Sequence, residues 1–510
     1  METNQLSLFQ VMDRFANEAP KKSLFADEKR DYGAEAFQNA AVEVANTLYH
    51  LGVRKGNLVC LRSVRSIDTM VLYAALTYLG ALTCLSDPHQ GCAEAMELNG
   101  MLSDVVFALT NERGGADLSA VGGWECVRVE DGKSFPIEIP LGKKKVDPAF
   151  DVRADIYAPS LIVFTSGSSN KAKGVTMSQY TIMNHLQNYA EAGSGSEEDC
   201  LLQLLPIHHV FGLCILLMAI WCRYRVYFAP SLDLDTTLDA IVKENVNACD
   251  SVPSFIVALA KAKEDRGLEL PSLKYSLMGG ANLLQEDIRY IEKTLNIRVF
   301  PVYGMSECIG IAGASYHESE EVRCHSVGHI LPMCEVRFVD ENNVDVPEGQ
   351  PGEIIVRGPT VMMGYYNDEQ GTREVIDEQG YLHTGDLGRL DEKGCLHIVG
   401  RKKEMIIRNG INISPAAIEE KVLNTGFFSE VAVVGIVDKK RGEVPAVAVV
   451  LKKGVLRKLA LSEEDVVSIL KNALLKIEIP AVAKILPSLP RLSSGKVDKV
   501  ALKAMLSQLK

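Results

Sequence analysis

Short apolar runs alternate with helix-like segments along the first part of the chain. Leu58–Leu61 is a predicted strand, Ile67–Leu79 has the hydrophobic spacing of a helix, and Val105–Leu109 is the next predicted strand. Such alternation is typical of a mainly parallel sheet that is covered by helices. A second unit of this kind is predicted from Ile162 to Val302, with strands at Leu201–Leu205, Val226–Phe228, Leu273–Met278 and Val299–Val302.

The pattern changes later in the chain. From Glu335 to Val356, short strands with polar turns predict a small antiparallel or barrel-like subdomain. After Gly400, strand-like runs at Val431–Val437 and Ala446–Leu451 and a helical pattern at Ser462–Lys476 predict a compact α+β unit.

The 510 residues exceed what one hydrophobic core usually supports, so we expect at least two domains. With 47% hydrophobic and 24% charged residues, the composition is that of a globular protein and not of a disordered one. We place the boundary near Arg401, between a domain at residues 1–400 and a smaller domain at residues 401–510. The predicted fold class is α/β, with two parallel α/β subdomains, the barrel-like subdomain and an α+β C-terminal domain.

Charge and cysteine usage restrict the class of protein. A net charge of −12 argues against non-specific nucleic-acid binding, which needs a basic surface. The twelve cysteines show neither C-x-x-C pairs nor the regular spacing of a disulfide framework, so we expect reduced, mostly buried thiols. No signal peptide is evident, and the most apolar run, Gly212–Trp221, is too short to cross a bilayer. We therefore expect a cytoplasmic protein without stable membrane insertion.

The segment Thr165–Gly174, T-S-G-S-S-N-K-A-K-G, directly follows the apolar run Leu161–Phe164. A buried strand that leads into a loop of small and hydroxyl residues ending in lysine is suited to wrap a polyphosphate. Lys171 and Lys173 supply the charge. The kinase-type phosphate loop is excluded, because Lys173 is followed by glycine and valine and not by serine or threonine. ATP or a similar triphosphate is the predicted ligand, and a plain connector is the alternative.

Four further segments accompany this loop: Y-G-M-S-E at Tyr303–Glu307, Y-L-H-T-G-D at Tyr381–Asp386, G-R-K-K-E-M-I-I-R-N-G-I-N-I-S-P at Gly400–Pro415, and L-P-R-L-S-S-G-K at Leu489–Lys496. In that order and at those separations, the five segments resemble the adenylate-forming superfamily of acyl- and aryl-CoA synthetases, peptide-synthetase adenylation domains and firefly-type luciferases. The resemblance extends from the region of Gly80 to Lys496. Three positions depart from the family pattern: Asn170 replaces a usual glycine, Ala172 a usual proline and Leu492 a common threonine.

The resemblance implies how the chain would bind the phosphates of ATP. Attack of a carboxylate on the α-phosphate brings two anions together, so the site must neutralise charge. The phosphate cradle is matched by Thr165, Ser166, Gly167, Ser168, Ser169 and Lys173. Glu307 matches the position that holds Mg²⁺, a hard ion that prefers oxygen ligands, and Ser306 matches the threonine whose hydroxyl meets the α-phosphate.

Adenine and ribose recognition is implied for Gly280, Ala281, Tyr303, Gly304, Asp386 and Arg401. Tyr303 resembles the ring that stacks on adenine, with the segment at Gly280 as the other wall of the slot. Asp386 resembles the carboxylate that accepts both ribose hydroxyls, and Arg401 resembles a second ribose contact. Taken alone, Tyr303 would suit a core position and Asp386 a turn.

The C-terminal segments resemble those of a mobile lid. Lys496 matches the lysine that bridges the acid and the α-phosphate during adenylation, although S-S-G-K alone would suit an exposed turn. Lys403 matches the hinge. Rotation there would withdraw Lys496 and bring Gly410 and Ile411 to the site, where they would line a tunnel for the pantetheine of CoA.

The acid pocket is predicted from fewer signals. His209, in L-P-I-H-H-V-F-G, matches a position beside the acyl group, although a lone histidine is usually structural. No aspartate stands between Leu201 and Leu232 to pair with a substrate ammonium group, which argues against amino acids. Gly304 stands where acetate-specific relatives carry tryptophan, which predicts a deeper pocket, and Val302 replaces a common glycine. We expect a medium- or long-chain or aromatic acid.

These signals together predict an ATP-dependent carboxylic acid:CoA ligase that forms an acyl-adenylate, releases pyrophosphate and then makes a thioester. Its cofactors would be ATP, Mg²⁺ and coenzyme A. The alternatives are an enzyme that stops at the adenylate or loads a free-standing carrier protein, and a degenerate nucleotide-binding homologue, which Asn170 and Ala172 motivate. The chain could also form a homodimer, which the sequence neither favours nor excludes. An oxidative, luciferase-like activity has no support in the sequence.

Overall fold

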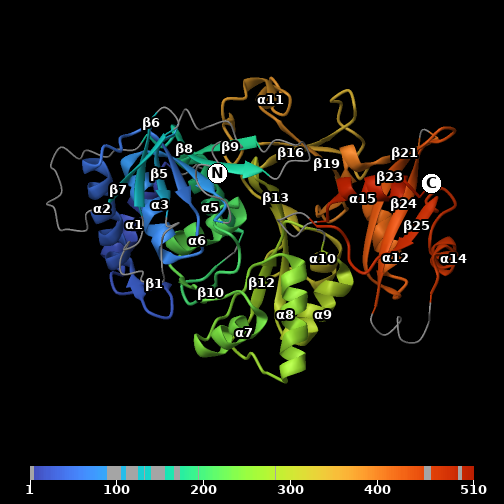
Figure 1. The fold of residues 1–510 in the computed structure, drawn as a ribbon, viewed down its shortest axis with the longest axis horizontal. Helices are drawn as coiled ribbons and strands as arrows, with labels where there is room; N and C mark the ends of the chain where they lie inside the picture. The colour runs from blue at the N-terminus through green and yellow to red at the C-terminus, as the bar shows by residue number, and fades with distance from the viewer. Residues whose placement is uncertain are drawn as a thin grey trace. The chain divides into compact units, whose positions relative to one another are not determined.

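The computed structural model describes residues 5–88, 105–110, 125–130, 133–138, 155–165, 173–192, 195–281, 283–409, 411–452, 461–491 and 497–509. The chain groups into two compact units, Met1–Glu335 with Val356–Leu382 and Val336–Ile355 with His383–Lys510. Figure 1 labels their helices and strands. The domain boundary near Arg401 stays a prediction. Within the described ranges, no helix is both long and apolar enough to span a membrane.

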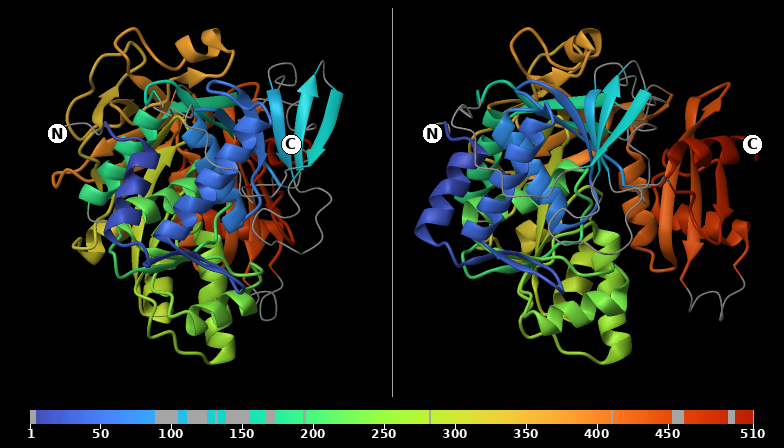
Figure 2. Two further views of the ribbon diagram at one scale, coloured as in Figure 1. Left: turned by 90° about the vertical axis from the view of Figure 1, so that its left-hand side faces the viewer. Right: turned by 60° about the vertical axis from the view of Figure 1, so that its left-hand side comes forward.

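The largest sheet of the first unit has eight strands in the order β18-β9-β8-β4-β3-β5-β6-β7. These strands are β3 (Leu58–Arg62), β4 (Leu82–Ser86), β5 (Val105–Thr110), β6 (Glu125–Glu130), β7 (Lys133–Glu138), β8 (Pro159–Thr165), β9 (Lys173–Ser178) and β18 (Gly364–Tyr365). The inner strands β8, β4, β3 and β5 run parallel, as the alternating pattern predicts. Antiparallel strands extend both edges, and the cyan strands β6 and β7 form one of them in Figure 2.

The helices of this part of the chain are α1 (Leu8–Glu18), α2 (Ala34–His50), α3 (Ile67–Leu79), α5 (Gln179–Glu191) and α6 (Val210–Cys222). Helix α3 has the predicted bounds. Its first turn is capped by the Ser66 hydroxyl, which accepts a hydrogen bond from the Thr69 N–H, and Gly80 ends it with a left-handed φ of 67°. Nearly every side chain of α3 is buried, as expected for a helix that is apolar on all sides.

The described part of the first unit also contains two four-stranded sheets, in the orders β10-β11-β1-β2 and β12-β13-β14-β15. Their strands are β1 (Ser23–Ala26), β2 (Asp31–Gly33), β10 (Cys200–Leu202), β11 (Arg225–Tyr227), β12 (Tyr275–Met278), β13 (Arg298–Met305), β14 (Cys308–Gly313) and β15 (His329–Ile330). Strands β12 and β13 are parallel, whereas β13 and β14 form an antiparallel hairpin. The predicted parallel α/β unit therefore ends in an antiparallel edge.

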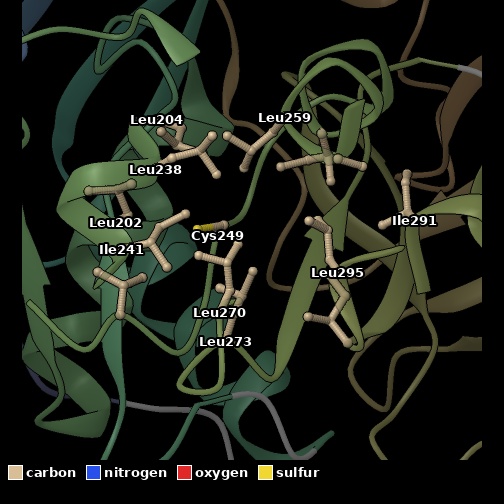
Figure 3. Close-up of a cluster of buried hydrophobic side chains, with 14 of the residues drawn as sticks. Leu202, Leu204, Leu238, Ile241, Cys249, Leu259, Leu270, Leu273, Ile291 and Leu295 are labelled. Carbon is tan, nitrogen blue, oxygen red and sulfur yellow. The ribbon is translucent and has the colours of Figure 1, made fainter. Parts of the chain in front are cut away.

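The helices of this region surround a buried apolar cluster. They are α7 (Leu234–Lys243), α8 (Pro253–Arg266), α9 (Gln285–Leu295) and α10 (Glu320–His325), and α11 (Glu369–Arg373) follows later in the chain. Leu238, Leu259 and Leu295 bring α7, α8 and α9 together, and Figure 3 shows their side chains gathered around Cys249. Cys249 is a free thiol, as are nine other cysteines whose side chains are described, and most of the ten are buried as predicted.

The described residues of the second unit form two sheets. The first has the order β16-β17-β19-β20, with β16 (Glu335–Val339), β17 (Gly352–Arg357), β19 (Leu382–Leu390) and β20 (Leu396–Arg401). It includes the segment predicted to be barrel-like, and within the described residues it does not close into a barrel. The prediction of short strands joined by polar turns is confirmed there.

The second sheet follows a short 3-10 helix, η1 (Lys402–Glu404), and has five strands. Its elements are β21 (Ile406–Arg408), β22 (Ile411–Ile413), α12 (Pro415–Leu423), β23 (Phe428–Asp438), β24 (Gly442–Leu451), α14 (Glu463–Ala473), β25 (Val482–Ile485) and α15 (Lys499–Ser507). Alternate residues of β24 face opposite sides, as the period of a strand requires. Val447 and Val449 pack with α12 and α14, whereas Ala446 and Ala448 pack with α15. This confirms the predicted α+β unit.

Candidate active site

The ends of the predicted phosphate loop are held together by strand pairing. Strand β8 ends at Thr165 and β9 begins at Lys173, and these two residues are antiparallel partners. Residues 166–172 connect them, so the loop leaves and re-enters the sheet at one point. The predicted cradle residues Ser166, Gly167, Ser168 and Ser169 lie outside the described residues, together with the departures Asn170 and Ala172.

Ser306 and Glu307 form the two-residue turn between β13 and β14, because Met305 and Cys308 are the last paired residues of the hairpin. The Glu307 side chain is buried and Ser306 is half-buried. Gly304 precedes the turn. A Cβ at that position would lie 2.2 Å from the carbonyl oxygen of Ile309, so the hairpin itself requires a glycine there. Gly304 therefore has a backbone role that is independent of the size of the acid pocket.

Glu307 is joined to Lys173 through a residue that the sequence did not single out. The Tyr365 hydroxyl donates a hydrogen bond of 2.8 Å to Glu307 Oε1. The Lys173 Nζ lies 4.4 Å from the centre of the Tyr365 ring, which is the geometry of a cation–π contact. Burial and then the nearby Glu307 charge raise the pKa of Tyr365, so the phenol keeps its proton and remains a donor. The glycine and paired tyrosines at residues 364–366 were the only sequence signal for this contact.

The predicted adenine slot lies at the carboxyl ends of two parallel strands, where open α/β sheets bind ligands. Met278, the last residue of β12, pairs with Pro301 of β13. The segment Gly280–Ala281 follows β12, and Tyr303 lies near the end of the neighbouring strand β13. Gly280 has a φ of 78°, which favours glycine, and both Gly280 and Ala281 are exposed. Tyr303 is half-buried.

Side chains of the predicted acid pocket approach the same strand ends. A Cβ placed on Gly279 would lie 2.8 Å from Val302 Cγ2 and 3.8 Å from the ring of Phe211. His209 is the N-terminal flanking residue of α6 and is half-buried, and its ring centre lies 4.4 Å from that of His208. Val302 and Phe211 therefore give Gly279 apolar and partly aromatic side-chain neighbours.

The second unit brings together two further predicted residues, Asp386 and Arg401. They are antiparallel partners on β19 and β20, and the Arg401 Nε lies 3.0 Å from the Asp386 Oδ1. Lys403 is exposed in η1, and Ile411 is exposed at the start of β22. The catalytic Lys496 and the CoA-site Gly410 predicted from the sequence lie outside the described residues.

Comparison with known proteins identifies the family of this chain. Residues 12–366 match the family described as AMP-binding enzyme, and residues 417–496 match the AMP-binding enzyme C-terminal domain. The chain belongs to the AMP-binding enzyme family. This AMP-binding enzyme is 30% identical over 480 residues to a 2-succinylbenzoate–CoA ligase of Bacillus cereus, with 92% of each chain covered. The predicted membership of the adenylate-forming superfamily is thereby confirmed.

Solved structures confirm the fold. The o-succinylbenzoate CoA synthetase from Bacillus subtilis, in complex with its acyl-adenylate intermediate, has a TM-score of 0.80 at 24% identity, with 98% of each chain covered. ATP-bound MatB from Rhodopseudomonas palustris has a TM-score of 0.83 at 23% identity, with 99% of each chain covered. The predicted α/β architecture, with a large N-terminal part and a small C-terminal part, is shared with these proteins.

Proposed function

We propose that this AMP-binding enzyme is an ATP-dependent carboxylic acid:CoA ligase that proceeds through an acyl-adenylate. The arrangement of Lys173, Tyr365 and Glu307 carries the proposal. It places a cation over the ring of Tyr365 at the exit of the loop, and a buried carboxylate at the hydroxyl of the same tyrosine, within one compact unit. A site for a triphosphate and a divalent cation needs both charges close together.

The donor set suits Mg²⁺. Glu307 is a buried carboxylate on a tight turn, and within the described residues only its Oε1 has a hydrogen-bond donor, Tyr365. The second oxygen, Oε2, is the proposed Mg²⁺ ligand. When bound there, the ion would reduce the negative charge of the phosphate groups. Ser306, which precedes Glu307 in the turn, is the proposed donor to the α-phosphate.

The remaining roles are distributed over both units. Tyr303 would stack on adenine, and Asp386 would accept the ribose hydroxyls with Arg401 beside it. Lys496 would neutralise the charge that develops when the acid attacks the α-phosphate, and His209 would border the acyl group. Lys403 would be the hinge that exchanges Lys496 for Gly410 and Ile411 when CoA reacts.

The enzyme class predicted from the sequence, an AMP-forming acid–thiol ligase with ATP, Mg²⁺ and CoA as cofactors, is confirmed at the level of the family. The choice of acid belongs to the proposal. An aromatic acid is favoured by the apolar and aromatic neighbours of Gly279, Val302 and Phe211, and the relative from Bacillus cereus is named for an aromatic substrate. A medium- or long-chain acid is the alternative substrate that we propose. We also propose the cytoplasmic location that the sequence predicts.

A substrate screen tests this function. Pyrophosphate release is measured with 2-succinylbenzoate, benzoate, octanoate, acetate and phenylalanine, with and without CoA, and thioester formation is followed by mass spectrometry. We expect aromatic or medium-chain acids to give pyrophosphate and a CoA thioester, each dependent on ATP and Mg²⁺. Pyrophosphate without a CoA thioester would indicate another acceptor, such as a carrier protein. No pyrophosphate with any acid would contradict the ligase assignment.

A further inference from the structure

Tyr365 occupies a position where three parts of the proposed site meet. It pairs with Val175 of β9, and Lys173 lies two residues before Val175 on the same strand. Residues two apart on a strand share a face, and a long side chain can reach the diagonal neighbour on the next strand. This register explains why the Lys173 ammonium group lies over the Tyr365 ring. The Tyr365 ring therefore contacts Lys173, the residue at which the chain returns from the phosphate loop to the sheet.

The hydroxyl of the same residue reaches Glu307 because the chain before Tyr365 is fixed to the β13–β14 turn. The Met362 N–H donates a hydrogen bond of 2.8 Å to the Glu307 carbonyl oxygen, and Val361 forms a bridge with Cys308. Two residues after Met362, Gly364 adopts a φ of 145° and lies against Thr372. The backbone thus turns from the Glu307 hairpin into the pairing with β9.

The position of Tyr365 is fixed from both sides. Its N–H donates to the Thr372 hydroxyl at 2.8 Å, and the N–H of the next residue, Tyr366, donates to the Gly174 carbonyl at 2.7 Å. Tyr365 is 9% exposed. A buried side chain held at its backbone and its hydroxyl has little rotational freedom, so it can impose an orientation on the groups it touches.

We propose that Tyr365 is a positioning residue that couples the phosphate loop to the magnesium carboxylate. Its hydroxyl holds Oε1 of Glu307 and directs Oε2 to the cation, while its ring holds the Lys173 ammonium group at the exit of the loop. The inference rests on the proposed ligase function, in which Glu307 binds Mg²⁺. Partners that orient a metal ligand typically change metal affinity by about 10- to 100-fold when they are removed.

Two substitutions separate the roles of the hydroxyl and the ring. Tyr365→Phe removes the hydrogen bond to Glu307 and keeps the ring, whereas Tyr365→Leu removes both. Tyr290→Phe is the matched control, because Tyr290 donates a hydrogen bond of 2.7 Å to Glu264 between α9 and α8 and has no place in the proposed site. Binding of Mn²⁺ to the full-length protein is measured by electron paramagnetic resonance with the non-cleavable analogue α,β-methylene-ATP.

We expect Tyr365→Phe to weaken Mn²⁺ binding in the ternary complex by about tenfold. Its affinity for the analogue measured without metal should stay within about twofold of wild type, since the Lys173 contact with the ring remains. Tyr365→Leu should weaken both affinities, and Tyr290→Phe should weaken neither. Raising Mg²⁺ should restore the adenylation rate of Tyr365→Phe and not that of Tyr365→Leu.

Unchanged Mn²⁺ affinity in Tyr365→Phe would overturn the proposal. A lower melting temperature with wild-type metal and analogue affinities would show that the residue serves only the stability of the fold. Glu307→Gln distinguishes this failure from failure of the proposed function. If Glu307→Gln also binds Mn²⁺ like wild type, the error lies in the magnesium assignment; if Glu307→Gln loses Mn²⁺ and Tyr365→Phe does not, only the positioning role is wrong.

Discussion

Arg401 and Asp386 face each other across the antiparallel strands β19 and β20, with the Arg401 Nε 3.0 Å from the Asp386 Oδ1. The Asp386 side chain is 7% exposed and that of Arg401 is 59% exposed. The Asp386 N–H donates to the Thr384 hydroxyl, which in turn donates to the Ile354 carbonyl, so the backbone that carries the carboxylate is fixed. The guanidinium can turn toward solvent, and the buried acceptor would then be available to a diol.

Asp386→Ala should therefore raise the KM for ATP and slow both half-reactions, because the ribose contact is kept throughout the cycle. Hydrogen bonds to a charged group contribute roughly 1.5–3 kcal/mol, which corresponds to about a 10- to 100-fold loss in kcat/KM. Adenylation and thioester formation are measured separately over a range of ATP concentrations. Arg401→Ala is the comparison variant and should lose less, since its side chain is mostly exposed. An unchanged dependence on ATP in Asp386→Ala would remove this residue from the site.

Lys496 is expected to act in one half-reaction only. Lys496→Ala should lower the adenylation rate by several powers of ten, because losing electrostatic stabilisation of the developing charge costs roughly 3–4 kcal/mol or more. Thioester formation from supplied acyl-adenylate should stay within about tenfold of wild type. Lys503→Ala is the control, since Lys503 contacts Glu443 on the exposed surface of the same unit. Equal losses in both half-reactions would contradict a role limited to adenylation.

The acid pocket is tested best at Val302. Gly304→Trp, which the sequence alone suggests, is a poor choice because even a Cβ there would lie 2.2 Å from the Ile309 carbonyl oxygen. Val302→Gly instead removes a half-buried side chain beside Gly279. It should raise kcat/KM for a bulky aromatic acid relative to benzoate by about tenfold, the usual scale for a change of this size in an apolar pocket. If Val302→Gly has the same ratio of kcat/KM values as wild type, the acyl group does not bind next to Val302.

Asp250 should make the stability of the first unit depend on pH. Burial, opposed by the Leu277 N–H and reinforced by Asp199, raises the pKa of Asp250 to about 7. The folded state then holds a proton that the unfolded state releases near pH 4. The stabilisation is fully present below about pH 4 and is lost as the pH rises to about 7, so ΔG of unfolding falls over that range.

Asp250→Asn keeps an acceptor for the Leu277 N–H and cannot ionise. As the pH rises from 5 to 8, we expect the stability of Asp250→Asn to fall less than that of wild type. The difference between their melting temperatures should be smaller at pH 5. Differential scanning calorimetry at both values measures this, and Asp265→Asn on helix α8 is the control for a non-specific loss of one negative charge. Parallel melting profiles for Asp250→Asn and wild type would show that Asp250 is ionised in the fold.

Much of the local structure could be predicted because its causes are local. Helix α3 has its predicted ends, since Ser66 and Gly80 mark them in the sequence itself. The ends of strands were harder to predict from the sequence. The apolar run Leu201–Leu205 predicts a longer strand than β10, which stops at Leu202, because Leu204 and Leu205 are buried outside regular pairing. An apolar run predicts that its residues are buried, but it does not by itself predict which of them form the hydrogen bonds of a strand.

In the candidate site, too, the residues inside local motifs could be predicted, and those that depend on distant contacts could not. Glu307 and Lys173 were found through the motifs that contain them. Tyr365 was not, because its role depends on contacts with residues far away in the sequence and its strand is only two residues long. The Asp386–Arg401 pair was likewise predicted as two ribose contacts and not as an ion pair, since only the register of β19 and β20 brings the side chains together.

The hinge prediction depends on Lys403, the middle residue of η1, which follows β20 directly. A hinge residue absorbs a change in φ and ψ, whereas proline holds φ near about −65° and restricts the residue before it. Lys403→Pro should therefore hold the C-terminal lid in one orientation, which we expect to be the adenylating one. Lys403→Ala is the matched control, because it removes the charge and keeps the backbone freedom.

Rapid-quench measurements separate the two half-reactions of these variants. Lys403→Pro should release pyrophosphate in a single burst that matches the enzyme concentration, retain the acyl-adenylate, and fail to form the thioester when CoA is added. Lys403→Ala should turn over with both half-reactions intact, because an alanine can still rotate about both backbone bonds. Steady thioester production by Lys403→Pro at the wild-type rate would show that the lid turns about another residue. Loss of the burst itself would show that the fixed orientation is not the adenylating one.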